Sequence, residues 1–145
     1  MREILFRAKQ HYTKEWLYGA VVKDGDECLI TVGDSDGLYK QKMTVVEEST
    51  VGQFTGLLDK HGRKIFEGDI VAKDVFQKRE RIDSDGNKLH VFEINKPKIQ
   101  KTAVVEYCSK RGKFDTGTPE ICFDFASDFY IIGNIHDNPE LLEVK

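Results

Sequence analysis

Apolar and polar residues alternate along most of the chain, and this period of two predicts β-strands. In the first segment, Ile4, Phe6 and Ala8 fall on one face, whereas the other face is mainly charged and includes Arg7. Three further strand-like segments follow along the chain, at residues 16–22, 28–32 and 38–46. The pattern therefore predicts an N-terminal part, residues 1–47, built from strands.

Turn signals separate these segments. The Asp24-Gly25 pair is typical of a tight hairpin turn in which both central residues have positive φ. Residues 33–37, with the sequence GDSDG, predict another turn. Because short turns connect consecutive strands, we expect a β-meander in this part of the chain.

The stretch 50–73, TVGQFTGLLDKHGRKIFEGDIVAK, predicts a strand, a tight turn, a second strand and the start of a third. Two glycines interrupt the first strand, which indicates a bulge or the close approach of another backbone segment. A glycine at the end of each turn can adopt positive φ at little cost, and an aspartate after the second turn can bond the backbone two residues further on. The residues with these predicted structural roles are Gly52, Gly56, Gly62, Gly68 and Asp69.

Residues 74–101 differ from their surroundings because they are rich in charge. Counted from Lys73 to Lys101, eight basic and five acidic residues give a net charge of +3. An Asp83–Gly86 turn lies in the middle, and an apolar segment at 88–94 follows it. We predict a charged hairpin insertion that stands off the body, either solvated or in contact with a partner. The candidate partner or phosphate contacts in it are Lys78, Arg79, Arg81, Lys96, Lys98 and Lys101.

The remaining pattern predicts an all-β protein with a small SH3-like barrel at residues 48–145. Closing a sheet into a barrel removes the exposed edges that promote aggregation. An open sheet or a sandwich is the alternative. A short helical turn is expected at the end, with Asn138 as its cap and Pro139 at its first position. The five strands assigned to the barrel are residues 64–73, 88–94, 102–108, 120–125 and 129–135.

Composition limits the class of protein. The chain has 145 residues, 39% apolar and 32% charged, with a net charge of −3, which is typical of one globular domain. The acidic balance argues against indiscriminate binding to nucleic acid or anionic membranes. No apolar run approaches the roughly 20 residues of a membrane helix, and the first residues do not resemble a secretory signal. We therefore expect a cytoplasmic protein without a membrane partner.

Candidate chemistry is sparse. The three cysteines, Cys28, Cys108 and Cys122, are widely spaced, so reduced and buried thiols are expected rather than a metal cluster. No phosphate-binding glycine loop occurs, and the Asp-rich segments 34–37 and 83–86 lack the glycine spacing of calcium loops. A hydrolytic set of Cys108, His136 and Asp137 can be drawn but has no motif behind it, and His61 and His136 are expected to be exposed. We predict no enzyme activity and no cofactor.

Three segments nevertheless resemble the YopX family of bacterial and prophage proteins: MREILFRA, TVGQFTGLLDKHGRKIFEGDIV and FYIIGNIHDNPELL. Residues 74–101 have no counterpart in this resemblance, as expected of a variable insertion. The resemblance implies a mainly β protein encoded by a phage or mobile element, which self-associates. It brings no established activity and no catalytic residue.

Two functions follow as hypotheses. The first is a non-enzymatic protein-binding or self-assembling module, a homo-oligomer or a binder of a host or phage protein. The alternative is a nucleic-acid-binding small β-barrel, which rests on analogy between folds and on the modest positive charge of the insertion. An unrecognised enzyme comes third. Four aromatic residues are candidate contact anchors in the first hypothesis, although a place in the core is favoured for each of them: Trp16, Tyr18, Phe54 and Phe129.

Overall fold

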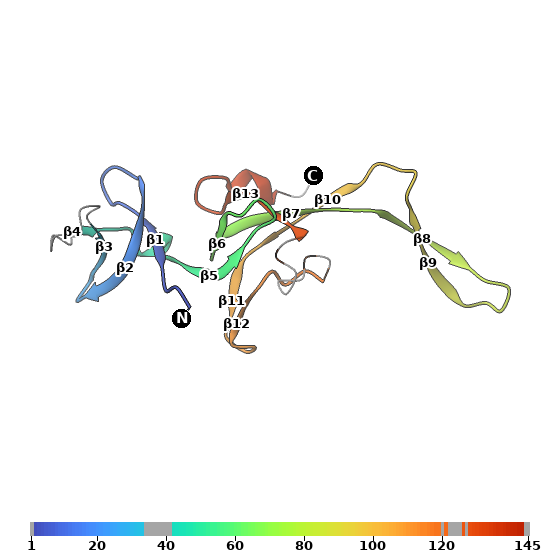
Figure 1. The fold of residues 1–145 in the computed structure, drawn as a ribbon, viewed down its shortest axis with the longest axis horizontal. Coiled ribbons are helices and arrows are strands. Elements are labelled where there is room, and N and C mark those ends of the chain that lie inside the picture. Colours follow the sequence, from blue (N-terminus) through green and yellow to red (C-terminus); the bar gives the residue numbers. More distant parts are fainter. Residues whose placement is uncertain (1, 34–41, 120, 122–125, 127, 144–145) are drawn as a thin grey trace.

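The structure is a computed structural model, which describes residues 2–33, 42–119, 121, 126 and 128–143. Its described elements are thirteen β-strands and short 3-10 turns, and all of the paired strands are antiparallel. The predicted all-β class is therefore confirmed. The molecule is elongated, with a six-stranded sheet at one end and a two-stranded arm at the other (Figure 1).

The six-stranded sheet contains the predicted meander. Its hydrogen-bonded order is β4-β3-β2-β1-β5-β6. Between β2 and β3, Asp24 pairs with Glu27, and Gly25 has a φ of +58°. Asp24 belongs to β2 and does not have positive φ, so the prediction of positive φ at both Asp24 and Gly25 was wrong for Asp24. The strands are β1 (Phe6–Lys9), β2 (Trp16–Asp24), β3 (Glu27–Val32), β4 (Lys42–Val45), β5 (Gly52–Leu58) and β6 (Lys64–Phe66).

The N-terminal part and the rest of the chain share this sheet. Strand β1 pairs with β5 in the register Phe6 to Gln53 and Arg7 to Gly52, and the 3-10 turn η1 (Glu48–Thr50) precedes β5. A hydrophobic cluster lies on the N-terminal side, formed by Ala8, Cys28, Ile30 and Val46. The predicted turn at 33–37, beyond Gly33, and the start of the strand predicted at 38–46 lie outside the described residues.

A second sheet forms the middle of the molecule. Strand β7 (Asp69–Val75) lies between β10 (Ile99–Val104) and β13 (Tyr130–Asn134). The register of β13 shifts between Ile131 and Gly133, which marks a bulge. A separate hairpin is formed by β11 (Glu106–Cys108) and β12 (Lys113–Asp115). The core here consists of Ile65, Val71, Ala103, Val105, Ile121, Ala126 and Phe129.

The predicted barrel is only partly recovered in this part of the chain. The segment 64–73 is two strands divided at Gly68, and 102–108 is two strands divided at Val105. The segment 88–94 belongs to the arm instead, and most of 120–125 lies outside the described residues. Because β10-β7-β13 is an open order in the described pairing, SH3-like closure stays a prediction.

The charged insertion is the arm, residues 74–101. Its strands β8 (Gln77–Ile82) and β9 (Lys88–Glu93) form a two-stranded sheet of their own. They project from the long strands β7 and β10, as the hairpin prediction required (Figure 1). The predicted turn at its tip is also confirmed, because Gly86 has a φ of +84° and its N–H donates to the Asp83 carbonyl.

The four glycines have the backbone geometry that their predicted structural roles require. Gly56 has a φ of +88° and lies at the register shift between β5 and β6. Gly62 and Gly68 have φ of +78° and +89° at the ends of their turns. Gly52 allows a close approach, because a Cβ there would lie 2.5 Å from the carbonyl oxygen of Glu67.

The chain ends in the expected helical turn, η3 (Pro139–Leu142), with proline in its first turn. Asn138 does not cap it through its side chain, so that part of the prediction was wrong. Its Oδ1 instead accepts from the backbone N–H of Asn134, at 3.3 Å, and thereby holds the turn against β13.

Candidate functional site

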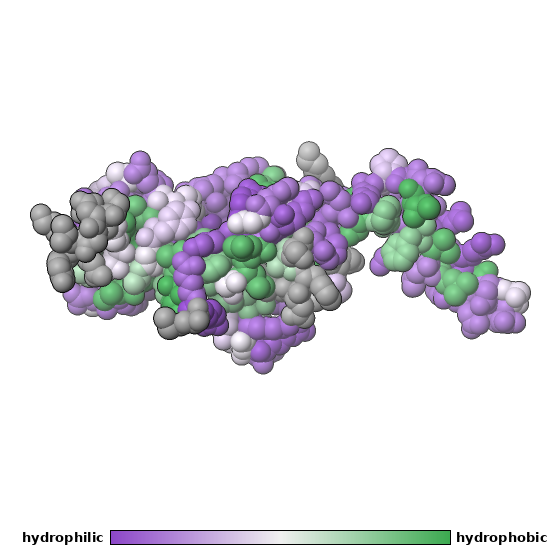
Figure 2. Space-filling view, in the orientation of Figure 1, coloured by the Kyte–Doolittle hydropathy of each residue, from purple (hydrophilic) through white to green (hydrophobic). Residues whose placement is uncertain are grey.

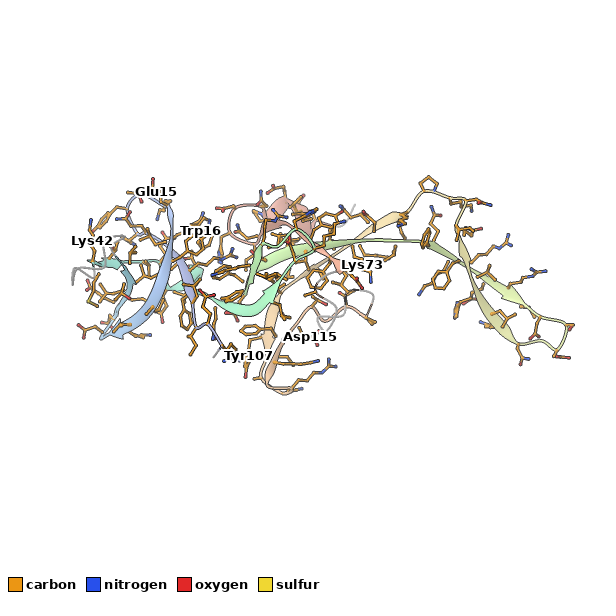
Figure 3. The ribbon with its side chains drawn as sticks, viewed as in Figure 1. Glu15, Trp16, Lys42, Lys73, Tyr107 and Asp115 are labelled. Carbon is orange, nitrogen blue, oxygen red and sulfur yellow. The ribbon has the colours of Figure 1, made fainter. Side chains whose placement is uncertain are left out.

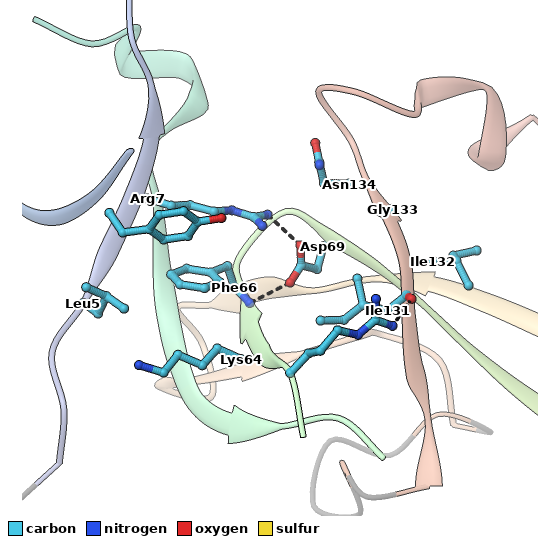
Figure 4. A pocket seen from close by; sticks show the side chains of 11 residues that line it. Leu5, Arg7, Lys64, Phe66, Asp69, Ile131, Ile132, Gly133 and Asn134 are labelled. Carbon is cyan, nitrogen blue, oxygen red and sulfur yellow. Dashed lines mark hydrogen bonds and ion pairs between the residues drawn. The ribbon is translucent and has the colours of Figure 1, made fainter. Parts of the chain in front are cut away.

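The three segments that carry the family resemblance meet at one junction between the two sheets (Figure 4). At its centre, Arg7 of β1 forms an ion pair with Asp69 of β7, with 2.7 Å between Nη2 and Oδ1. Only 9% of the Arg7 side chain and 2% of the Asp69 side chain are exposed. An ion pair so deeply buried links the strands because neither charge can return to water without separating the elements.

Neighbouring groups complete the environment of this ion pair. The guanidinium of Arg7 lies between two rings, 4.8 Å from the centroid of Trp16 and 4.9 Å from that of Phe66. Asp69 Oδ2 accepts from the backbone N–H of Phe66 at 2.8 Å. Asp69 therefore bonds three residues back rather than two residues on, which corrects the prediction. Burial raises the pKa of the Asp69 carboxyl, and the charge of Arg7 opposes this rise.

A second buried aspartate, Asp59, attaches the 59–63 turn to β13. Its Oδ1 accepts from the N–H groups of His61 and Arg63, both at 2.9 Å. Its Oδ2 accepts from the N–H of Ile131 at 3.0 Å, while Arg63 Nη2 donates to the Ile131 carbonyl at 2.5 Å. Burial alone raises the pKa of Asp59, but hydrogen bonds from these backbone groups outweigh burial and lower it. The turn thus supplies hydrogen-bond partners to the backbone N–H and carbonyl of Ile131 on the outer edge of β13, as a neighbouring strand would.

The closing segment joins the junction through Asp137. Its carboxylate pairs with Lys9 and accepts from Trp16 Nε1 at 2.7 Å and from Asn134 Nδ2 at 3.0 Å. These three side-chain bonds hold the pKa of Asp137 well below its usual range. The C-terminal segment is therefore tied to β1 and β2 of the first sheet.

His136, expected to be exposed, is half-buried, with its ring 5.9 Å from that of Trp16. Burial lowers its pKa, and the charges of Arg7 and Lys9 lower it further. His61 is exposed, as predicted. Cys28 is buried and free, whereas Cys108 is half-buried rather than buried, and Cys122 lies outside the described residues.

An open cleft of about 480 Å³ lies beside the ion pair (Figure 4). One wall is formed by β1, β2 and β6, and the other by the bulged part of β13. Basic, acidic, aromatic and aliphatic groups all contribute to its surface. Its lining includes Arg7, Tyr18, Arg63, Lys64, Asp69 and Gly133.

The predicted contact residues lie on the arm, but they do not form one surface. Successive residues of a strand face opposite sides, so Lys78 lies on one face of β8, and Arg79 and Arg81 lie on the other. Lys96 pairs with Glu93 at 2.9 Å. Lys98 lies 4.6 Å from the centre of the Phe76 ring.

Lys78 and Lys101 do come together, in a groove of about 560 Å³ at the base of the arm. Val75, Phe76, Phe92 and Ile99 supply its apolar lining. The candidate aromatic anchors are divided: Phe54 and Phe129 are buried, Trp16 is half-buried, and Tyr18 is 48% exposed.

The hydrolytic set does not assemble as a unit. Cys108 lies in the β11–β12 hairpin, whereas His136 and Asp137 contact Trp16 of the other sheet. Within the described part of the chain, no three His, Cys, Asp or Glu side chains are grouped so that they could hold a metal ion. No helix among these residues is long and apolar enough to cross a membrane.

Sequence reasoning missed Arg7, Asp59 and Asp137 as partners across the fold. Arg7 falls on the mainly charged face of its predicted strand, and Asp59 lies in the tight turn predicted within residues 50–73, so neither position indicates a distant partner. The one usable signal was that all three lie in or beside the segments that resemble a family.

Fold and junction together define an all-β protein in which an N-terminal strand, two central turns and a C-terminal strand are joined by buried charged groups. The chain belongs to the YopX family: the family model described as "YopX protein" matches residues 5–143. Its fold is similar to the crystal structure of protein EF1440 from Enterococcus faecalis, at 23% sequence identity and a TM-score of 0.56, covering 99% of this chain and 100% of that chain. Among curated proteins, nothing matches.

Proposed function

We propose that this YopX-family protein is a non-enzymatic, phage- or prophage-encoded module that assembles with further copies of itself through its arm. The observation that carries the proposal is the exposed apolar surface of the arm. Among the described residues, seventeen large apolar side chains are exposed, and seven of them lie on the arm, although it comprises residues 74–101 only. They are Phe76, Ile82, Leu89, Val91, Phe92, Ile94 and Ile99.

The arm does not bury these side chains by itself. None of its residues is buried, and within the described strand pairing β8 and β9 pair only with each other. Side chains project from both of its sides, and apolar residues are visible along its length (Figures 2 and 3). A two-stranded hairpin is at best marginally stable alone in water, so a covering surface stabilises it.

Charge complementarity supports a second copy as the covering surface. The segment 73–101 carries +3 and the whole chain −3, so the other residues carry −6. An arm of one copy is therefore attracted to the acidic body of another. The charged groups at the junction are engaged in bonds that join strands, which supports a structural role for them rather than a catalytic one.

Sedimentation of the wild-type protein tests this proposal. We expect a reversible oligomer that dissociates on dilution. Replacing both Phe92 and Ile94 by Ser should shift the equilibrium to the monomer, because two apolar contacts at the arm are lost. Tyr12→Ser, at an 83% exposed position on the body, is the matched control and should have no effect. A wild-type monomer at every concentration refutes self-assembly.

Nucleic-acid binding is the second candidate, and one observation favours it. The groove at the base of the arm combines the Phe76 and Phe92 rings with Lys73, Lys78 and Lys101. Rings that stack on bases beside cations that contact phosphates are typical of single-strand binding. A binding titration with single-stranded DNA at low salt tests this candidate, because electrostatic affinity is greatest there. Binding that is lost in a Lys78→Ala, Lys101→Ala double variant favours this function over self-assembly.

A further inference from the structure

The cleft at the junction has a basic lining and is separate from the arm. It lies beside the Arg7–Asp69 pair, whereas the proposed assembly surface is the arm. Three basic side chains line it, Arg7, Arg63 and Lys64, against a single carboxylate, that of Asp69. The cleft is therefore a place where positive charge exceeds negative charge within an acidic protein.

Two carboxylates outside the lining, those of Asp59 and Glu3, balance this excess formally, so a bound anion has to take the place of one of them. Arg63 Nε lies 3.2 Å from Asp59 Oδ2, and Asp59 has further hydrogen bonds to three backbone N–H groups. Lys64 pairs at 2.8 Å with Glu3, whose side chain is 53% exposed. An exposed ion pair of this kind contributes little, so a ligand can displace Glu3 at low cost.

Both arginines retain unused hydrogen-bond donors. Among the described residues, the partners of the Arg7 side chain are Asp69 and the Glu67 carbonyl, both bonded through Nη2. Its buried Nε has no hydrogen-bond partner within that part of the chain, and the side chain is only 9% exposed. Arg63 bonds to described residues through Nε and Nη2 and not through Nη1. Leaving a buried donor unpaired is costly, and such a group in a native structure calls for a partner.

We propose that this cleft binds a small phosphate monoester. A guanidinium group presents parallel donors that match phosphate oxygens, and a lysine adds a point charge. Arg63 and Lys64 hold the phosphate at the mouth of the cleft, with the charge of Arg7 behind them. The half-exposed ring of Tyr18 provides a flat apolar surface for the remainder of the ligand.

An NMR titration of the full chain tests this site with three probes: adenosine 5′-monophosphate, inorganic phosphate and adenosine. We expect the two phosphate compounds to shift the backbone amides of Gly133 and Asn134, which line the cleft. Adenosine, which lacks the anion, should not shift them. Absence of saturable shifts with either phosphate compound overturns the proposal, as does an equal response to adenosine.

Variants separate this site from general charge attraction. Lys64→Gln should weaken the response to phosphate roughly tenfold, because one charge-assisted bond is lost. Arg63→Gln should weaken it as much or more, but it also removes the bond to Ile131, so Lys64→Gln is the decisive variant. Arg79→Gln, on the arm, is the matched control and should bind as the wild type does. Equal weakening in Lys64→Gln and Arg79→Gln contradicts a defined site.

Discussion

The same five-residue turn occurs twice in this molecule, once in the body and once at the tip of the arm. The sequences are DKHGR at 59–63 and DSDGN at 83–87. In the body, Asp59 Oδ1 accepts from the second and fourth following N–H groups, both at 2.9 Å. In the arm, Asp83 Oδ1 does the same at 2.9 and 2.8 Å. The glycines in the fourth position have φ of +78° and +84°.

The two turns differ in the hydrogen bonds that their side chains make to the rest of the chain. Asp59 and Arg63 also bond the backbone of Ile131 on a strand far along the chain. The side-chain bonds of Asp83 remain within its own turn, to Asp85 and Asn87. Local sequence is therefore sufficient to form the turn, whereas long-range contacts decide whether it supports the fold. The body turn is bonded to a distant strand of the same chain, whereas the side chain of the arm turn is bonded only within the turn and the arm is exposed.

Removing the buried ion pair should give the largest difference in stability between a variant of the body and a matched variant of the arm. Asp69→Ala leaves the charge of Arg7 buried and unpaired, which costs about 3–5 kcal/mol of unfolding free energy. Glu80→Ala is the matched change in the arm, where Glu80 and Lys88 lie 3.7 Å apart and are both exposed. That variant should unfold as the wild type does. Denaturant unfolding measures both, and equal losses contradict the account.

Replacing the first aspartate of each turn should give the next largest difference in stability. Asp59→Ala should cost about 2–4 kcal/mol, because it leaves the Ile131 N–H and Arg63 Nε without their acceptor. Asp83→Ala should leave global unfolding unchanged, since only exposed bonds within the turn are lost. Thermal melts of the two variants measure the difference. A large loss for Asp83→Ala shows that the arm is part of the cooperative unit.

The glycines of the two turns should differ in the same way when each is replaced by valine. Gly62→Val should lower the unfolding free energy by about 1–3 kcal/mol, because valine is strained at positive φ. Gly86→Val carries the same strain but should act only on the arm. We expect faster hydrogen exchange in β8 and β9, with the global melting temperature unchanged. Wild-type stability of Gly62→Val contradicts the strain argument.

The smallest predicted effect concerns pH. The folded pKa of His136 lies below its ordinary value of 6.5, so the unfolded chain binds a proton first as pH falls. Its contribution is complete above pH 6.5 and is lost as pH falls through the folded pKa. His136→Gln should therefore flatten the decline of stability between about pH 7 and pH 5. An unchanged slope in denaturant titrations excludes His136 as its source.

Sequence predicted the features that depend on neighbouring residues. Gly62, Gly68 and Gly86 were recognisable because a turn imposes positive φ within a few positions. The protruding arm was recognisable from its charge. By contrast, the alternation in β1 correctly separates Arg7 from Ala8 but does not reveal that both faces are covered.

The candidate site was less predictable for the same reason. Partners such as Arg7 and Asp69, or Asp59 and Ile131, are far apart in the sequence, and only the packing of two sheets brings them together. The burial of His136 likewise depends on Trp16, which belongs to another strand. Composition and periodicity contain no information about such pairs.

Hydrogen exchange measured at low and high protein concentration tests the contrast between the arm and the body most directly. The amides of β7 and β13 should be strongly protected at both concentrations, because their partners lie within the same chain. The amides of β8 and β9 should exchange rapidly in dilute protein and about tenfold more slowly once copies cover the arm. Arm amides that exchange at the same rate at both concentrations contradict the account.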